Sequence, residues 1–172
     1  MEMKELLDKT IDVNYKADTF FYKKPARAVP NGPATVADLR RLDAFLGAQG
    51  IKAPESYKSC LSIYNGIKDF LAPGYSLLSV DEVIGKTSEI SAQFDREYPD
   101  LVRFVIAASD DLDFMAFDVA TADAGEGYEV GGVTAEGRGP RYKDFTQFLV
   151  EGLATLEQTI LEQERDRKKL KP

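Results

Sequence analysis

The sequence predicts an α+β domain in which helices flank a small antiparallel sheet. Four segments of the main body carry apolar residues at helical spacing. Three shorter runs have strand composition: residues 103–107, 113–117 and 128–133. The short, turn-rich links between these runs favour an antiparallel meander over strands joined by crossover helices. Helices and strands segregated in this way are typical of the α+β class.

Residues 1–34 are the least regular part of the chain. Residues 4–11 fit a short helix, and residues 19–22 have the aromatic content of a strand. Prolines and a glycine between positions 25 and 33 then mark a connector. At 172 residues the chain has the length of one domain with extensions. We therefore divide it into an N-terminal extension (1–34), a main domain (35–160) and a basic C-terminal tail (161–172).

The first two helices of the main domain have recognisable starts. One is expected to begin at Thr35, whose hydroxyl can cap a backbone N–H, with Asp38 in the first turn. Its apolar stripe consists of Val36, Leu39, Leu42, Phe45 and Leu46. The next helix opens at Pro54, where a missing N–H costs nothing, and ends at Asn65-Gly66, which can take the left-handed turn after it. Its apolar face consists of Tyr57, Cys60, Leu61 and Tyr64.

Two further helices follow in the second half of the domain. After a short strand at residues 75–78, Ser79 and Glu82 form a capping box that starts a third helix. Asp144 with Gln147 caps a long final helix. We expect six residues of the helical stripes to lie in the core: Phe45, Tyr57, Leu61, Tyr64, Phe148 and Leu149. Cys60, the single cysteine, is expected to be a small core residue rather than a reactive thiol.

Two groups of residues invite a functional interpretation but fit a structural one better. The glycines at 125, 127, 131, 132, 137 and 139 are interpreted as hairpin links. They do not fit a phosphate-binding loop, because Glu126 would stand where a phosphate sits and no helix opens directly afterwards. The strand aromatics are interpreted as core rather than as a base-stacking surface: Phe104, Phe114, Phe117 and Tyr128.

The chain contains no histidine, which removes the commonest general base and metal ligand. Every Ser-His and Cys-His arrangement is thereby excluded, and no spacing points to another nucleophile and base. Residues 110–113 are rich in aspartate but lack the spacing and central glycine of an EF-hand loop. We therefore expect no enzyme activity, no cofactor and no metal site.

Charge is distributed unevenly along the chain. The formal net charge is −7, and residues 81–129 hold 13 acidic residues against three basic ones. Such a field repels phosphate backbones and attracts basic partners, so nucleic acid is a poor candidate ligand. Charged residues among the first eight leave no apolar core for a signal peptide, and no apolar run approaches the length of a membrane span. A cytoplasmic location is expected.

Four segments in order resemble a known family: the proline-opened helix at 53–66, the stretch 75–82, the strand pair 104–118 and the helix start 142–149. The chain is similar to the SUKH superfamily (the Smi/Knr family) over about residues 35–155. It departs from the family at Ala53, where leucine usually precedes the proline, and at Asp110-Asp111, where the turn is often rich in glycine.

The resemblance implies the same α+β layout and a binding role. Many bacterial members of this superfamily are immunity proteins that bind and block toxins. It therefore implies that the chain neutralises a partner protein toxin, such as a basic nuclease, by occluding its active or substrate-binding face. The alternative that it leaves open is a non-catalytic regulatory or scaffold protein. A toxin encoded immediately upstream would favour immunity, and an isolated reading frame would favour the scaffold.

The candidate partner-binding residues are the carboxylates of the most acidic stretch outside a helix. They are Asp110, Asp111, Asp113, Asp123, Glu126 and Glu129. Their charge is expected to speed association with a basic partner and to add specificity. Because alternate strand residues face opposite sides, not all six are expected to share one surface.

Overall fold

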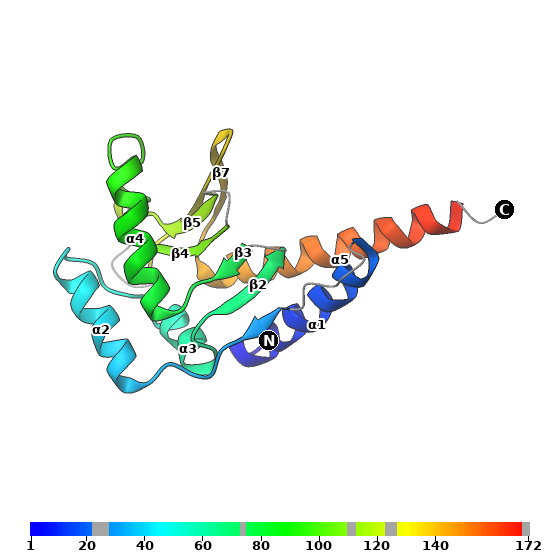
Figure 1. The fold of residues 1–172 in the computed structure, drawn as a ribbon, viewed down its shortest axis with the longest axis horizontal. Helices are drawn as coiled ribbons and strands as arrows, with labels where there is room; N and C mark the ends of the chain where they lie inside the picture. The colour runs from blue at the N-terminus through cyan, green and yellow to red at the C-terminus, as the bar shows by residue number, and fades with distance from the viewer. Residues whose placement is uncertain (22–27, 73–74, 110–112, 123–126, 170–172) are drawn as a thin grey trace.

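The computed structural model describes residues 1–21, 28–72, 75–109, 113–122 and 127–169, whose fold is drawn in Figure 1. These residues form five helices: α1 (Met3–Phe21), α2 (Val36–Gly47), α3 (Glu55–Ile63), α4 (Val80–Phe94) and α5 (Phe145–Lys169). They also form seven strands: β1 (Val29–Pro30), β2 (Ile67–Ala72), β3 (Tyr75–Leu77), β4 (Val105–Ala108), β5 (Phe114–Phe117), β6 (Val130–Thr134) and β7 (Gly137–Tyr142). A 3-10 turn, η1 (Val119–Thr121), follows β5. The predicted α+β class is confirmed.

The sheet is a meander whose strand order follows the sequence from β1 to β7. All of its neighbouring strands pair antiparallel, and α4 is inserted between β3 and β4. The predicted antiparallel pairing of the runs at 103–107, 113–117 and 128–133 is confirmed. Strands β1, β2 and β7 were not predicted from the sequence. Two of these, β1 and β7, are the edge strands, and each contains a proline, Pro30 and Pro140.

Helices cover both faces of the sheet (Figure 1). Residues an odd number of positions apart in a strand point to opposite faces, so Phe114 and Phe117 of β5 meet different helices. Phe114 contacts Phe94 of α4, with ring centroids 6.3 Å apart. Phe117 contacts Tyr57 of α3 and Phe145 of α5, at 5.6 and 6.0 Å. The core is therefore two layers of apolar side chains, one on each side of the sheet.

Four of the six predicted core residues are fully buried: Tyr57, Leu61, Phe148 and Leu149. Phe45 and Tyr64 are only partly buried and pack at the edge of the core. Tyr64 stays at the edge because its hydroxyl donates a hydrogen bond to Asp8 of α1 at 2.7 Å. Cys60 is buried as predicted, and this burial raises the pKa of its thiol to about 12.

The hydroxyl of Tyr57 is expected to destabilise the folded protein. The ring lies at the centre of the aromatic layer, edge-on to Phe104 and Phe145 with centroids 5.5 and 5.1 Å away. Its buried hydroxyl has no hydrogen-bond partner among the described residues. Because an unpaired buried hydroxyl is costly, Tyr57→Phe should raise the free energy of unfolding by about 1 kcal/mol. Urea denaturation followed by circular dichroism would measure it.

Tyr64→Phe is the matched control for this prediction. It removes the same hydroxyl group, but from a site where that group donates to Asp8. The control should therefore lower stability by about 0.5–1.5 kcal/mol. If both variants shifted stability in the same direction, the orphaned hydroxyl of Tyr57 would not be the cause.

The N-terminal helix corrects one expectation about the first 34 residues. The prediction of a strand at 19–22 is wrong for residues 19–21, because α1 continues as a helix to Phe21. Helix α1 packs along α5 and β2 and buries Leu6, Leu7 and Val13, so tertiary packing outweighs the local aromatic signal. Residues 161–169 of the predicted tail continue α5 beyond the body (Figure 1). The division of the chain at residues 34 and 160 stays a prediction.

The interpretation of the glycines as hairpin links is also partly wrong. Gly131 and Gly132 lie inside β6, and Gly139 lies inside β7. They are needed there for close packing: a Cβ on Gly131 would stand 2.8 Å from Leu101 Cδ2, and one on Gly132 would stand 2.8 Å from Met115 Sδ. Gly127, by contrast, does lie in a link, and Gly125 lies outside the described residues.

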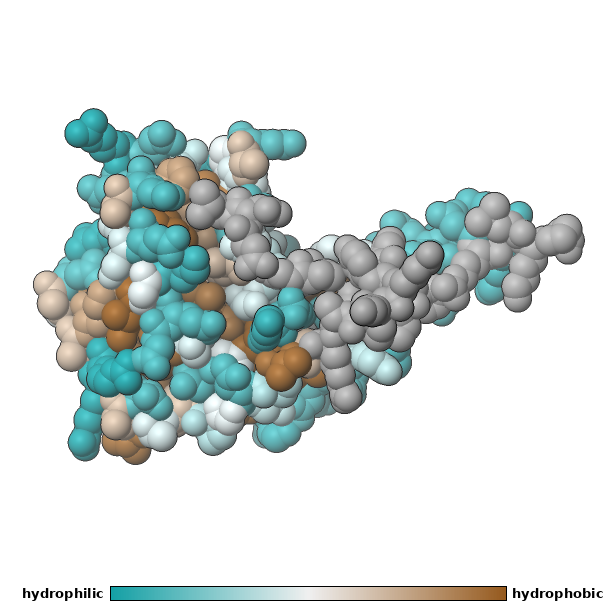
Figure 2. Space-filling view, viewed as in Figure 1, coloured by the Kyte–Doolittle hydropathy of each residue, from teal (hydrophilic) through white to brown (hydrophobic). Residues whose placement is uncertain are grey.

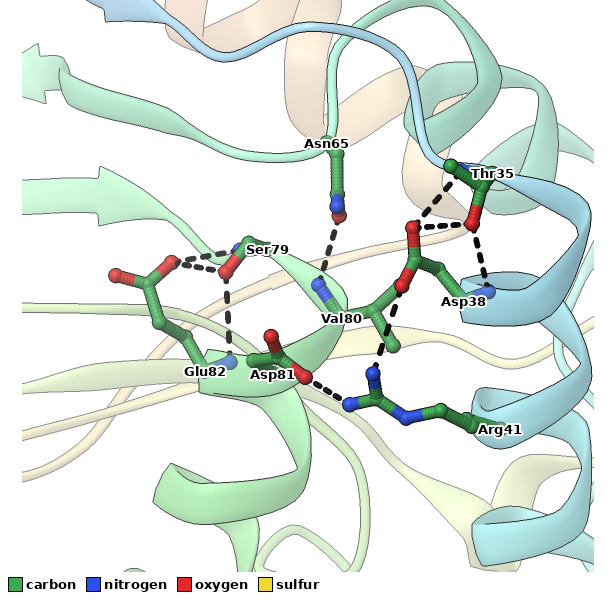
Figure 3. A network of polar contacts seen from close by, with 8 residues as sticks. All are labelled: Thr35, Asp38, Arg41, Asn65, Ser79, Val80, Asp81 and Glu82. Carbon is green, nitrogen blue, oxygen red and sulfur yellow. Dashed lines mark hydrogen bonds and ion pairs between the residues drawn. The ribbon is translucent and has the colours of Figure 1, made fainter.

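The predicted capping box of α4 is confirmed, and the predicted cap at Thr35 also proves to be a capping box. The close-up in Figure 3 shows that the two boxes belong to one polar network. Thr35 and Asp38 cap α2, and Ser79 and Glu82 cap α4. Arg41 joins the two helix starts because its guanidinium pairs with Asp38 at 3.5 Å and also with Asp81. The predicted cap on the last helix is confirmed as well, since Asp144 Oδ1 accepts a hydrogen bond from the backbone N–H of Gln147 at 2.7 Å.

The Asn65-Gly66 turn is tied into the same network. Asn65 Oδ1 accepts a hydrogen bond from the Val80 N–H at 2.9 Å, so the turn after α3 caps the start of α4 (Figure 3). Gly66 has the left-handed backbone that the sequence predicts, with φ +89°. One stripe assignment is wrong: Val36 is 67% exposed, because the fully buried stripe of α2 begins nearly two turns later, at Leu42. The charged groups of this network pair with one another, so its role is structural.

Candidate functional site

The structure describes two of the six predicted partner-binding residues, Asp113 and Glu129. The other four lie outside the described residues: Asp110, Asp111, Asp123 and Glu126. The two described carboxylates differ in what surrounds them. The six-residue assignment stays a prediction.

Glu129 belongs to a charge cluster with Arg141 and Asp118. Its Oε2 accepts hydrogen bonds from Arg141 Nη2 at 2.7 Å and Nε at 3.1 Å. The same Nη2 lies 2.6 Å from Asp118 Oδ2, whose side chain is only 8% exposed. Hydrogen bonds to these two carboxylates raise the pKa of the Arg141 guanidinium. Much of the charge of Glu129 is therefore balanced within the protein, which weakens its pull on a partner.

Asp113 lies immediately before β5 and has a different setting. Its Oδ1 accepts a hydrogen bond from the Ala135 N–H at 3.0 Å, and its own N–H donates to Ser109 Oγ at 3.2 Å. The first bond holds the side chain and the second holds the backbone, and Asp113 is one of the residues that line a hollow of about 250 Å³ in the surface. The other residues that line this sheet hollow are Leu71, Tyr75, Met115, Val133, Thr134, Pro140, Tyr142 and Phe148.

The sheet hollow is lined mainly by apolar and aromatic side chains. Tyr75 comes from β3, Tyr142 from β7 and Phe148 from α5, and the rings of Tyr142 and Phe148 meet edge-on at 5.4 Å. Burial raises the pKa of Tyr75, and the charges of Asp113 and Tyr142 raise it further. Burial and the nearby Glu151 raise the pKa of Tyr142. Both phenols are therefore neutral at physiological pH.

Sequence reasoning identified Asp113 but missed the hollow beside it. Tyr75, Tyr142 and Phe148 are brought together only by the meander and by the packing of α5, so no local spacing links them. The only sequence signal is the alternation that places Pro140 and Tyr142 on one side of β7. This alternation could not be recognised in the sequence, because residues 137–142 do not have the composition of a strand.

A second hollow, of about 660 Å³, lies between α1, β1 and the end of α3. The residues that line it are Asp8, Ile11, Asp12, Ala28, Val29, Pro30 and Tyr64. Its Asp8 is already engaged by Lys4 and by the Tyr64 hydroxyl, and these hydrogen bonds lower the pKa of the Asp8 carboxyl. The sheet hollow, in contrast, is lined by one of the predicted partner-binding residues, Asp113, and is therefore the better candidate for the site.

A family model described as SMI1 / KNR4 family (SUKH-1) matches residues 33–151, more than half of the chain. The chain belongs to the SMI1/KNR4 family. The match runs from just before α2 into α5 and includes every residue that lines the sheet hollow. The resemblance drawn from the sequence is thereby confirmed.

Membership of the SMI1/KNR4 family bears on function in a general way. The SUKH group is generally of a non-catalytic, immunity or regulatory type, and its members commonly bind partner proteins. A comparison with curated proteins found no match. Among the residues that the structure describes, no helix is both long and apolar enough to cross a membrane.

Proposed function

We propose that this SMI1/KNR4-family chain is an immunity protein that binds a partner protein toxin and blocks its active or substrate-binding face. The observation that carries the proposal is the family match over residues 33–151, because the family includes toxin immunity proteins. Occlusion requires only a rigid complementary surface. It is therefore compatible with a chain that lacks histidine and keeps its single thiol buried and protonated.

Charge supports the kind of partner that we propose. Residues 81–129 carry a net formal charge of −10, with 13 acidic and three basic residues. Asp95, Glu97 and Asp100, at and beyond the end of α4, are exposed, and Figure 2 shows hydrophilic side chains over that end of the molecule. Such a field speeds encounter with a basic cleft of the kind found in nucleases.

The test uses a toxin encoded beside this chain, purified and mixed with the full-length protein. We expect a stable complex, loss of toxin activity on complex formation, and survival of cells that express both proteins. Absence of binding and of protection would overturn the proposal and favour the regulatory or scaffold alternative.

Removing the charges of three predicted acidic residues tests which surface faces the toxin. A triple variant removes three charges while keeping side-chain size: Asp110→Asn, Asp111→Asn and Asp113→Asn. Association with a basic toxin should slow about tenfold at low salt, with a smaller effect on dissociation. The difference from wild type should shrink as salt is added, because exposed charges act over a Debye length of about 8 Å at physiological ionic strength. Surface plasmon resonance at several salt concentrations measures both rates.

The matched control removes three charges between residues 2 and 12, outside the acidic segment (residues 81–129): Glu2→Gln, Glu5→Gln and Asp12→Asn. All three residues are exposed. If net charge alone mattered, both triple variants would slow association equally. Equal slowing, or no slowing in either variant, would count against the acidic stretch as the toxin-facing surface.

A further inference from the structure

The sheet hollow combines two features that suit one class of group. The residues that line it include three aromatic ones, Tyr75, Tyr142 and Phe148, and one acidic one, Asp113. Glu151 follows Phe148 by one turn of α5, which places a second carboxylate on the same side of that helix, and its charge contributes to the raised pKa of Tyr142. Aromatic faces and carboxylates both attract cations, whereas an apolar ligand would gain nothing from the charges.

The carboxylates of Asp113 and Glu151 can each accept further hydrogen bonds. Asp113 Oδ1 accepts the Ala135 N–H, and the carboxylate of Glu151 accepts a hydrogen bond from Gln147 Nε2 at 2.7 Å. No lysine or arginine among the described residues forms an ion pair with either carboxylate. This setting contrasts with that of Glu129, whose charge is balanced by Arg141.

The lining also suits the stem of a long cationic side chain. Met115 and Pro140 supply apolar surface between the aromatic walls. Arginine and lysine side chains bury their aliphatic stems on such surface while their charged ends reach polar groups. A purely apolar anchor would instead reduce the hydration of the Asp113 carboxylate without offering it a partner, which is unfavourable.

We propose that the sheet hollow is a receptor for one cationic side chain, an arginine or a lysine, that projects from the partner toxin. The stem lies against Met115 and Pro140, the charged end meets the Asp113 carboxylate, and the rings of Tyr75 and Tyr142 flank the cation. This inference rests on the proposed function, because it names the feature of the toxin that this surface recognises. The negative charge of the acidic segment (residues 81–129) attracts a basic partner over a distance, and the hollow then binds one side chain of that partner.

The test needs no toxin. Backbone amide NMR spectra of the full chain are recorded during titration with N-acetyl-argininamide, with N-acetyl-lysinamide and with N-acetyl-norleucinamide, an uncharged analogue with an apolar side chain. We expect at least one of the cations to shift the amide signals of β3, β5 and β7 around the hollow, with millimolar affinity. The uncharged probe should bind about fivefold more weakly or not at all.

Variants then assign the interaction. Asp113→Asn keeps an oxygen that can accept the Ala135 N–H but removes the charge, and should weaken cation binding about fivefold. Tyr142→Leu removes one aromatic wall and should have a similar effect. Asp95→Asn, at the end of α4 and away from the residues that line the hollow, removes one charge as a control and should leave binding unchanged.

Three outcomes would overturn the inference: no shifts at the hollow with either cation, equal binding of the uncharged probe, or full binding by Asp113→Asn. Comparison of the three probes on the wild-type protein is decisive even if a variant fails to fold. Because the probes bind without a toxin, failure here is distinguishable from failure of the proposed function. A chain that binds the cationic probes but no toxin would retain the hollow as a cation receptor and lose the immunity role.

Discussion

Replacing Gly66 with alanine is expected to destabilise the domain by about 2–5 kcal/mol. Two effects combine at this position. The backbone has φ +89°, a conformation that residues with a side chain adopt at a cost. In addition, an added Cβ would lie 2.6 Å from the backbone nitrogen of Ser79 and 3.0 Å from its Cα. Backbone atoms cannot rotate out of the way, so the start of α4 would have to move.

The neighbouring contacts explain why that movement is costly. The Gly66 carbonyl accepts a hydrogen bond from the Asn31 N–H at 3.0 Å, and Asn65 Oδ1 caps Val80. Ser79 is the N-cap of α4. A shift of one segment therefore disturbs the connector before α2, the turn after α3 and the capping box of α4 together.

Gly85→Ala is the matched control for Gly66→Ala. Gly85 is an exposed position inside α4, and a Cβ there would meet nothing within 4 Å. Since alanine favours helix over glycine, this variant should gain about 0.5–1 kcal/mol. Urea denaturation of both variants measures the contrast. A loss below about 1 kcal/mol for Gly66→Ala would mean that the turn and α4 separate easily.

The helix starts were predictable because capping is local chemistry. Thr35 with Asp38 and Ser79 with Glu82 lie three residues apart, and each pair is complete within one turn of sequence. The predicted left-handed turn at Gly66 is confirmed for the same reason, since a glycine after an asparagine signals it directly. Features whose causes span four residues can be found without knowing the fold.

The edge strands were not predictable in this way. Residues 137–142 contain two glycines, a proline and two arginines, a composition that argues against a strand. They form β7 because its partner β6 offers a row of backbone groups, and Pro140 is tolerated at the edge of the sheet. The misread residues 19–21 illustrate the converse, since their aromatic content indicates a strand while they continue the helix α1.

The candidate site, too, was predictable from the sequence only in part. Asp113 was identified from its charge, which the sequence displays openly. The aromatic walls of the sheet hollow were not grouped, because Tyr75 and Tyr142 are brought close only by the three strands between them in sequence and by α5. A charge can be recognised from one residue, whereas a hollow depends on the register of the whole sheet.

A large loss of stability is expected for Leu61→Ala. Leu61 is fully buried in α3, one of the helices that cover the sheet face opposite α4. Truncation removes apolar contacts and leaves a cavity that rigid neighbours fill only in part, so the free energy of unfolding should fall by about 2–5 kcal/mol. The variant should still fold at low temperature, since the rest of the core is unchanged.

Leu161→Ala makes the same chemical change on α5, where the leucine is 50% exposed, and it should cost less than about 1 kcal/mol. Urea denaturation gives both values, and their difference isolates burial because propensity effects of leucine and alanine are similar in both helices. A small loss at Leu61 would mean that the stripe of α3 does not pack against the core. The apolar stripe of α3 would then be a candidate partner-binding surface. It would be an alternative to the acidic segment and the sheet hollow.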